Sequence, residues 1–228
     1  MKIRIKFRKY GPVRFIGHLD VMRFFQKAIR RAELDVVYTG GYSPHQVMTF
    51  AAPLGVGLES NGEYMDIEVN SLLSCQDITG RLNAASVYGI EIVGTKILPD
   101  SVGNAMASVA AASYTVRFRE GRKPNVDIGT VLPDFLAKDS ILITKATKKG
   151  SRELDLRPGI YEMNWDGNAF SMLVNASSAG NIKPIQIIEA LLAVHGETLQ
   201  ENALLVTRED MYTDISPEEN THQFISLG

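Results

Sequence analysis

The stretch Lys2-Ile3-Arg4-Ile5-Lys6-Phe7-Arg8 places basic and apolar residues in strict alternation near the start of this 228-residue chain. Because successive side chains of a β-strand point to opposite faces, the pattern predicts a strand with one buried and one basic face. The same alternation returns in Tyr114-Thr115-Val116-Arg117-Phe118-Arg119. This repeat indicates an internal duplication, in which each half of the chain opens with an equivalent strand.

The distribution of charge supports the duplication. Residues 1–34 carry ten Lys and Arg against two acids, and residues 35–112 carry two against eight. Residues 113–152 carry nine against four, and residues 153–228 carry three against twelve. Each half therefore begins basic and ends acidic, although the formal net charge of the chain is only −2.

Hydrophobic periodicity and turn residues give each half the general order β-α-β-β-α-β, and the pattern does not fix the number of strands between the two helices. In the first half they predict helices at 17–32 and 74–85, and strands at 2–8, 36–39, 47–52, 64–69 and 90–98. In the second half they predict helices at 126–136 and 184–194, and strands at 114–119, 141–146, 160–165, 169–175 and 204–207. We therefore expect an α+β protein with two ferredoxin-like βαββαβ halves in tandem. The expected domains are residues 1–100 and 101–228, with a flexible boundary at 99–112 and a loose tail from Ser216.

Composition limits the class of protein. The 45% apolar and 22% charged content is that of an ordinary globular chain. No run of about 18 apolar residues is present to span a membrane, and the N-terminus lacks the unbroken apolar stretch of a signal peptide. Cys75 is the only cysteine, which excludes an internal disulfide and suits a reducing compartment. We therefore expect a cytoplasmic protein without a membrane-spanning segment.

The predicted helix at 17–32 carries a basic face. Three of its cations follow one another at helical spacing: Arg23, Lys27 and Arg30. Cations in such a row can neutralise phosphates, and an aromatic ring among them, here Phe24, can stack on a base. The alternative is an ordinary solvated face opposite the core. The basic face of the strand at 2–8 favours anion binding, and Arg14 lies between the two elements.

The loop Gly40-Gly41-Tyr42-Ser43-Pro44-His45 combines flexibility with reactive side chains. Two glycines allow backbone amides to approach a ligand closely, while Tyr42, Ser43 and His45 offer stacking and hydrogen bonds. The loop lacks the lysine and the spacing of a phosphate-binding P-loop, so nucleotide hydrolysis is not indicated. The alternative is a strand connection that needs Gly and Pro only for its turn.

Histidines and carboxylates of the first half form a further candidate set for acid–base chemistry or a metal: His18, Asp20, His45, Glu59, Glu63, Asp66 and Glu68. His18 and Asp20 do not share a helical face, and Asp20 suits a helix N-terminus on electrostatic grounds alone. Asp66 and Glu68 alternate with apolar residues, as in any strand with a solvent-facing side. No spacing demands a metal site, so we expect no cofactor and no metal.

The second half contains one candidate motif. Asp155 and Arg157 share a face if their segment is extended, and Arg152 adds a cation. With Lys148 and Lys149 before them, they form a basic loop that can clamp a phosphate or a carboxylate. The alternative is a hairpin tip with a local ion pair, which contributes little when exposed.

Four motifs of the chain resemble one known family. They are Arg14-Phe15-Ile16-Gly17-His18-Leu19-Asp20, the residues from Gly41-Tyr42-Ser43-Pro44-His45 through Pro53-Leu54-Gly55-Val56-Gly57-Leu58-Glu59-Ser60, the segment Glu63-Tyr64-Met65-Asp66-Ile67-Glu68, and Arg152-Glu153-Leu154-Asp155-Leu156-Arg157-Pro158. Together they resemble the radical-SAM-linked proteins, a family of uncharacterised domains. Its members occur alone or fused behind a radical SAM protein with a cobalamin-type binding domain. Gln46 departs from the family pattern, in which a second proline follows His45.

The resemblance implies association with a radical SAM protein but supplies no mechanism. A radical SAM enzyme holds its iron–sulfur cluster through three cysteines. Because this chain has Cys75 alone, the resemblance implies a partner, substrate carrier or adaptor rather than the radical generator.

We therefore expect an accessory binding protein of a radical SAM system, which binds RNA or another phosphate-rich substrate. Two other classes stay open. One is an enzyme in which His18, His45, Tyr42 and Glu59 form an acid–base or metal site for a small substrate. The other is a protein–protein adaptor. The expected substrate-binding residues are Arg14, His18, Arg23, Lys27, Arg30, Tyr42, Ser43, His45, Glu59, Asp155 and Arg157.

Overall fold

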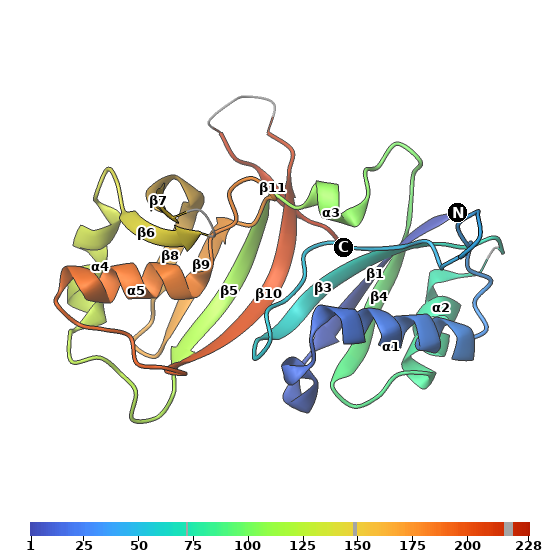
Figure 1. The fold of residues 1–228 in the computed structure, drawn as a ribbon, viewed down its shortest axis with the longest axis horizontal. Helices are drawn as coiled ribbons and strands as arrows, with labels where there is room; N and C mark the ends of the chain where they lie inside the picture. The colour runs from blue at the N-terminus through green and yellow to red at the C-terminus, as the bar shows by residue number, and fades with distance from the viewer. Residues whose placement is uncertain (72, 148–149, 217–220) are drawn as a thin grey trace. The chain divides into compact units, whose positions relative to one another are not determined.

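The computed structural model describes residues 1–71, 73–147, 150–216 and 221–228, which form two compact units (Figure 1). The first unit combines Met1–Ala110 with Arg208–Gly228, and the second is Ala111–Thr207. The boundary drawn from the sequence at residue 100 assigned the C-terminal residues to the second half. In the structure Arg208–Gly228 pack with the first unit, so the second unit is inserted into the first.

The described residues of the first unit form three α-helices and one 3-10 helix: α1 (His18–Arg31), α2 (Cys75–Ala84), α3 (Ala105–Ser108) and η1 (Gly11–Phe15). Its strands are β1 (Lys2–Lys9), β2 (Met48–Phe50), β3 (Glu59–Glu68), β4 (Ile90–Leu98), β11 (Phe224–Ser226) and, from Arg208 onward, β10 (Leu204–Asp214). The strand order is β4-β1-β3-β10, with β2 paired to β3 and β11 paired to β10. β1 runs antiparallel to both β3 and β4.

The alternation of β1 creates the apolar face that the sequence predicts. Ile3, Ile5 and Phe7 are completely buried against Phe25 of α1 and Leu82 of α2. Figure 1 shows α1 and α2 side by side over the strands of this unit. The core of the unit therefore lies between these two helices and one face of the sheet.

The basic side of β1 is covered, which corrects the expectation of a basic surface. Arg4 is 4% exposed, and its guanidinium donates to both carboxylate oxygens of Asp66, at 2.8 and 3.0 Å. Its partner Asp66 is buried as well, so the acidic side of β3 is not the solvent-facing surface that the alternation predicted. The guanidinium also donates to the carbonyl of Gly103 at 3.4 Å, within the segment expected to be a flexible boundary. Two further cations have internal acceptors: Lys2 donates to Val102 O and Lys6 to Asp210.

In the part of the second unit that the structure describes, there are two α-helices, a short 3-10 helix and a separate hairpin. Its elements are β5 (Ala111–Phe118), α4 (Ile128–Leu136), β6 (Leu142–Thr147), β7 (Gly150–Asp155), η2 (Arg157–Gly159), β8 (Ile160–Trp165), β9 (Ala169–Asn175), α5 (Pro184–Val194) and the first residues of β10. The strand order is β10-β5-β9-β8, while β6 and β7 pair only with each other among the described strands. Phe118, Trp165 and Phe170 contact one another edge-on or tilted, and Phe118 and Phe170 are core residues.

The chain is thus a mixed α and β protein, and several predicted elements differ in extent. The segment 36–39 makes only the isolated bridges Val36–Val69 and Tyr38–Gln46. β3 begins at Glu59 and β10 continues to Asp214, so both are longer than predicted. The tail was expected to be loose, yet its residues Phe224–Ser226 pair with β10. In the described part of the chain, no helix combines the length and the apolar character needed to cross a membrane.

Candidate functional site

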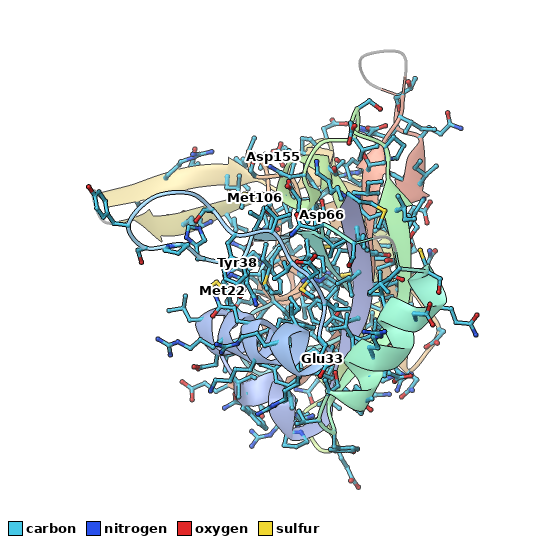
Figure 2. All side chains as sticks on the ribbon, turned by 90° about the vertical axis from the view of Figure 1, so that its right-hand side faces the viewer. Met22, Glu33, Tyr38, Asp66, Met106 and Asp155 are labelled. Carbon is cyan, nitrogen blue, oxygen red and sulfur yellow. The ribbon has the colours of Figure 1, made fainter. Side chains whose placement is uncertain are left out.

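The loop at residues 39–45 is fastened to α1 by the side chain of Gln46. This side chain is buried, and its amide nitrogen donates to the carbonyl of Gln26 at 3.3 Å and contacts the Tyr38 hydroxyl at 3.5 Å. Figure 2 labels Tyr38 in the segment that leads into this loop and Met22 on α1. A proline at position 46, as the family resemblance predicted, has no side-chain donor for these contacts.

Within this loop His45 makes an internal contact, whereas Tyr42 and Ser43 face solvent. The ring Nδ1 of His45 lies 3.1 Å from the Thr39 hydroxyl, which also accepts the backbone N–H of His45 at 3.1 Å. Tyr42 is fully exposed and Ser43 is exposed beside it. Gly41 has a φ of +100°, a backbone conformation that favours glycine. The loop therefore presents an aromatic ring to solvent from a fixed base on α1.

α1 presents exposed cations on the side opposite its core residues. Its core residues are Val21, Phe25, Ala28 and Ile29. We define the cationic face of α1 as the exposed Arg23, Lys27 and Arg30. Arg23 approaches Asp20 at 3.3 Å on the open surface, whereas no ion pair joins Lys27 or Arg30 to another described residue.

Phe24 does not belong to the cationic face, although the sequence suggested that it could stack on a base. The residue is half-buried and packs against the core of the first unit. Its ring meets that of Phe25 edge-on, with 5.2 Å between the centroids. The remaining aromatic candidate is therefore Tyr42.

Arg14 and Glu59, two of the predicted binding residues, are each other's partners. A guanidinium nitrogen of Arg14 lies 3.0 Å from Glu59 Oε1, which also accepts the backbone N–H of Gly11 at 3.1 Å. The Arg14 guanidinium lies over the ring of Phe15, 4.8 Å from its centroid. Both charged side chains are partly exposed. The pair fastens η1 to the start of β3.

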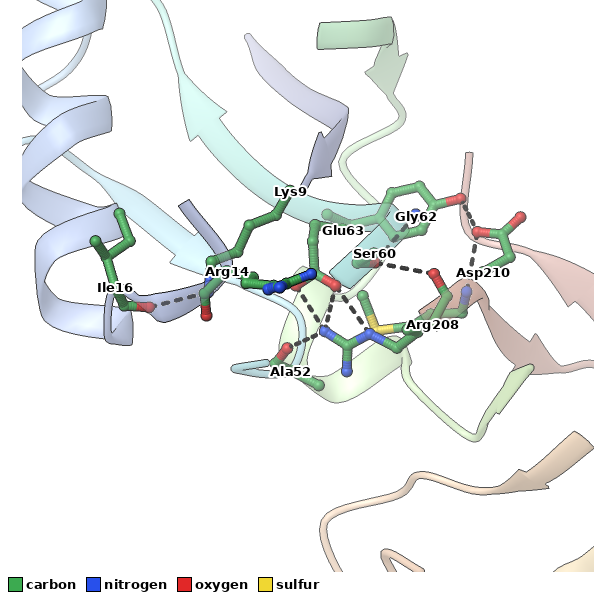
Figure 3. Close-up of polar contacts among 11 residues, drawn as sticks. Lys9, Arg14, Ile16, Ala52, Ser60, Gly62, Glu63, Arg208 and Asp210 are labelled. Carbon is green, nitrogen blue, oxygen red and sulfur yellow. Dashed lines mark hydrogen bonds and ion pairs between the residues drawn. The ribbon is translucent and has the colours of Figure 1, made fainter. Parts of the chain in front are cut away.

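A buried ionic cluster, formed by Lys9, Glu63 and Arg208, lies beneath η1 (Figure 3). Glu63 accepts from Arg208 Nε at 2.8 Å and from an Nη at 2.5 and 2.6 Å. The same Nη donates to the carbonyl of Ala52 at 2.7 Å. A fork of this kind gives strong, geometrically defined hydrogen bonds, which offset part of the cost of burying both charges.

Lys9 is the third member of the cluster and is 2% exposed. Its ammonium donates to the carbonyl of Ile16 at 2.9 Å and reaches that of Arg14 at 3.5 Å. Burial lowers the pKa of Lys9, the negative charge of Glu63 opposes this effect, and the positive charge of Arg208 adds to it. Lys9 therefore holds the turn between η1 and α1 from inside the unit.

A small cavity of about 20 Å³ adjoins the cluster. It is lined by Phe7, Lys9, His18, Val21, Phe50, Ala52, Pro53, Leu54 and Glu63. His18 meets Phe50 edge-on, with 5.1 Å between ring centroids. A volume of this size holds about one water molecule and is too small for a substrate. His18 is thus a half-buried residue that lines this cavity.

The structure does not gather the predicted acid–base or metal residues into one site. His18 adjoins the cavity, His45 braces the loop, and Glu59 is engaged with Arg14 and Gly11. Within the described ranges, no three His, Cys, Asp or Glu side chains are placed to hold a metal ion together. The geometry gives no support to the mixed metal site.

Asp155 and Arg157 stabilise the backbone of the second unit. Asp155 accepts the N–H of Ile141 at 2.8 Å and that of Arg157 at 3.0 Å, and the bond from Ile141 is the largest cause of its lowered pKa. The Arg157 guanidinium donates to the carbonyls of Leu136 and Ile160. The predicted basic loop at Lys148 and Lys149 lies outside the described residues.

The buried ionic cluster was missed by the sequence reasoning, although two of its members leave a signal. In the alternating pattern of β1, Lys9 falls on the same side as Ile3, Ile5 and Phe7. In that of β3, Glu63 falls on the same side as Met65 and Ile67. A charge in a buried register indicates a buried partner. Arg208 leaves no such signal, because the predicted final strand ended at Thr207.

Comparison with known proteins gives a family and no activity. No curated protein matches the chain. Among solved structures, a crystal structure of an unknown protein from Galdieria sulphuraria is 11% identical, over 91% of this chain and 96% of that one. Its TM-score of 0.28 is too low to support an argument from structure. A family model described as an uncharacterized protein conserved in bacteria matches residues 2–184. The chain therefore belongs to this bacterial family, DUF2344.

Proposed function

We propose that the cationic face of α1 and the Tyr42 loop together bind a phosphate-rich polymer, and that single-stranded RNA is the substrate class. One observation carries the proposal. The fully exposed ring of Tyr42 lies on a loop that Gln46 fastens to the same helix that bears Lys27 and Arg30. Proteins grip single strands by combining cations that contact the phosphates with exposed aromatic rings that stack on the bases, and this helix and its loop offer both.

In the proposed mechanism the cations bind the phosphates, and Tyr42 makes the contact with a base. Arg23, Lys27 and Arg30 neutralise phosphates and release counterions, so binding weakens as salt rises. Tyr42 stacks on a base, a contact that contributes about 1–3 kcal/mol per base. Arg14 contributes less, because its charge is paired with Glu59 in a partly buried contact, whereas the longer Arg23–Asp20 pair lies on the open surface.

The sheet of the first unit is not the proposed binding surface. An RNA-binding sheet of the ferredoxin-like kind uses exposed aromatic and basic residues on its open face. Here the helices cover one face, and Arg4, Tyr64 and Asp66 are buried on the other. The helix and loop instead offer an exposed surface that is both basic and aromatic.

A charge-reversal pair tests the cationic face. We expect Arg23→Glu/Lys27→Glu to abolish binding of a fluorescein-labelled oligouridine and to flatten what remains of the salt dependence, measured by anisotropy. The matched control is Lys96→Glu/Arg122→Glu, which makes the same change in net charge at exposed positions outside the site and is expected to retain binding. Unchanged binding by the first variant contradicts the proposal.

A second pair of variants tests the stacking contact. Tyr42→Ala is expected to weaken oligouridine binding by the loss of about 1–3 kcal/mol, with no change in the salt slope, because stacking releases no counterion. Tyr42→Phe keeps the ring and is expected to bind as the parent protein does. Equal losses in both variants assign the effect to the hydroxyl and remove stacking from the mechanism.

We also propose that the two halves are ferredoxin-like βαββαβ units arranged in tandem along the chain. The strand orders support this: β4-β1-β3-β2 in the first half and β10-β5-β9-β8 in the second. Numbered within its own half, with the separate β6–β7 hairpin left out of the second, each order reads fourth, first, third, second. α1 and α2, and α4 and α5, take equivalent places in the two sequences of elements.

The motif resemblance further leads us to propose a radical SAM protein as a cytoplasmic partner that modifies the bound polymer. Cys75 alone cannot hold an iron–sulfur cluster, so the radical chemistry belongs to that partner. Co-expression with a radical SAM protein of the same cell, followed by size-exclusion chromatography, tests the association. Elution of the two chains as separate species overturns it.

A further inference from the structure

An open groove lies between β6 and α5 of the second unit. It has a volume of about 720 Å³ and is lined by Leu142–Lys145 of β6, by residues from Phe135 to Ile141, and by α5 residues from Gln186 to Val194. No residue of β7 lines it, and Figure 1 shows β6 between β7 and α5. The groove therefore follows the edge of β6 that does not pair with β7.

In the pairing of β6 with β7, some backbone N–H and C=O groups of β6 point away from β7 and toward this groove. The carbonyl of Ile141 accepts the N–H of Leu156, in the same register that pairs Leu142 with Asp155. In an antiparallel ladder alternate residues bond the partner strand, so Ile143 and Lys145 are directed to β7. Leu142 and Thr144 direct their N–H and C=O groups to the other edge. Among the described strands β6 pairs only with β7.

The side chains around the groove define what would pair there. Leu142 is 61% exposed and Val194 is 50% exposed, while Ala190 and Ala193 leave room above α5. The charged lining residues are Lys138, Lys145 and Glu189, which leaves a net positive charge. An extended segment with alternating apolar and acidic residues complements both the apolar lining residues and the two lysines.

We infer that this groove binds an extended acidic–apolar peptide of another protein, which adds to β6 as a third strand. Main-chain hydrogen bonds to Leu142 and Thr144 supply the alignment, and alternate apolar side chains enter the groove against Leu142 and Ala193. A lysine on an edge strand often serves only to prevent pairing. Here the edge borders a groove of about 720 Å³ with apolar lining residues on both β6 and α5, which a merely protected edge does not need.

A peptide titration followed by ¹H–¹⁵N NMR of the full chain tests the inference. The probes are three synthetic peptides that alternate valine with glutamate, threonine or lysine. We expect the glutamate peptide to bind most tightly and to shift the amide signals of Leu142, Thr144 and Ala193. The same peptide carrying N-methyl groups on alternate residues keeps its side chains but loses backbone donors, and is expected to bind at least tenfold more weakly. Equal binding of the N-methylated peptide, or no shift along β6 with any of the three, overturns strand addition.

Two protein variants locate the site. Ala193→Trp fills the groove from an exposed position on α5 and is expected to weaken glutamate-peptide binding at least tenfold. Ile185→Trp makes a bulky change at an exposed position of the same helix outside the groove and is expected to bind as the parent. An NMR spectrum that keeps its dispersion shows that each variant is folded. If oligouridine, and none of the peptides, shifts the signals along β6, the groove binds nucleic acid and the inference is overturned. The Arg23→Glu/Lys27→Glu experiment tests a different surface, so its outcome does not depend on the peptide titration.

Discussion

The cationic face of α1 and the cations of the first-unit sheet contain the same residue types in opposite settings. Lys27 and Arg30 are exposed and have no ion-pair partner among the described residues, whereas Arg4 and Arg208 are buried in bidentate contact with Asp66 and Glu63. Removing a charge from water costs several kcal/mol and is tolerated only with a well-placed partner. A basic residue in the sequence therefore indicates an anion-binding surface only if it forms no ion pair with a carboxylate of the folded protein.

The largest effect that separates the two settings is expected from Arg208→Ala. This change leaves Glu63 buried without its partner, which costs roughly 3–5 kcal/mol of unfolding free energy. Urea unfolding followed by circular dichroism measures the loss. The control Glu63→Leu/Arg208→Met removes both charges and is expected to recover most of it. A loss of about 1 kcal/mol or less, the value of a surface pair, would show that the cluster is solvated.

Gly62→Ala is expected to have the next largest effect, because β3 packs closely on β10 at this residue. An added Cβ would lie 2.7 Å from Glu209 O and 2.8 Å from Asp210 Cα. Overpacking of this kind costs about 1–3 kcal/mol. Gly40→Ala is the matched control, since its Cβ meets no atom within 4 Å. Thermal unfolding of both variants gives the comparison, and equal stability would contradict the close packing.

Lys9 is expected to make stability depend on pH in the alkaline range. Burial lowers its pKa below the ordinary value of 10.5. Between the folded pKa and 10.5 the unfolded chain binds more protons than the folded one, so the unfolding free energy rises with pH across this window. Lys9→Met removes the group, and its profile should be flatter over the same range. Parallel profiles of the two proteins in urea titrations at stepped pH would refute the assignment.

Lys27→Ala and Arg30→Ala are expected to have the smallest effect on stability. Substitutions on an open helix surface usually change the unfolding free energy by less than about 0.5 kcal/mol. Oligouridine binding should weaken in both variants, which separates the binding role from the structural one. A stability loss as large as that of Arg208→Ala would show that these side chains have partners in the fold.

Local patterns were sufficient to predict the elements around the candidate site. The alternation in β1 gave its buried face, and helical spacing placed α1 within one residue at each end. The helix predicted at 74–85 matches α2, and the hydroxyl of Ser74 at its start accepts the N–H of Asp77 at 3.0 Å. These features depend on neighbours in sequence, which periodicity and capping rules describe well.

Features that depend on distant parts of the chain were not predictable in this way. β10 continues through Arg208, Glu209 and Asp210, where three successive charges obscure the strand pattern. Those charges are satisfied by Glu63, Asn61 and Lys6, far away in sequence. Gln46 also differs, because its importance arises from a contact with the backbone of α1 rather than from its own segment. Patterns within one segment of sequence do not reveal the distant partners of such residues.

The return of Arg208–Gly228 to the first unit has a consequence for how the protein is made. During synthesis Glu63 emerges from the ribosome long before Arg208 does. Until the last strand emerges, the nascent first unit contains an acid without its guanidinium and lacks one strand beside β3. The inserted unit, Ala111–Thr207, is continuous and complete by then. Synthesis therefore favours maturation of the inserted unit first, and the N-terminal residues, although made earliest, acquire their final packing last.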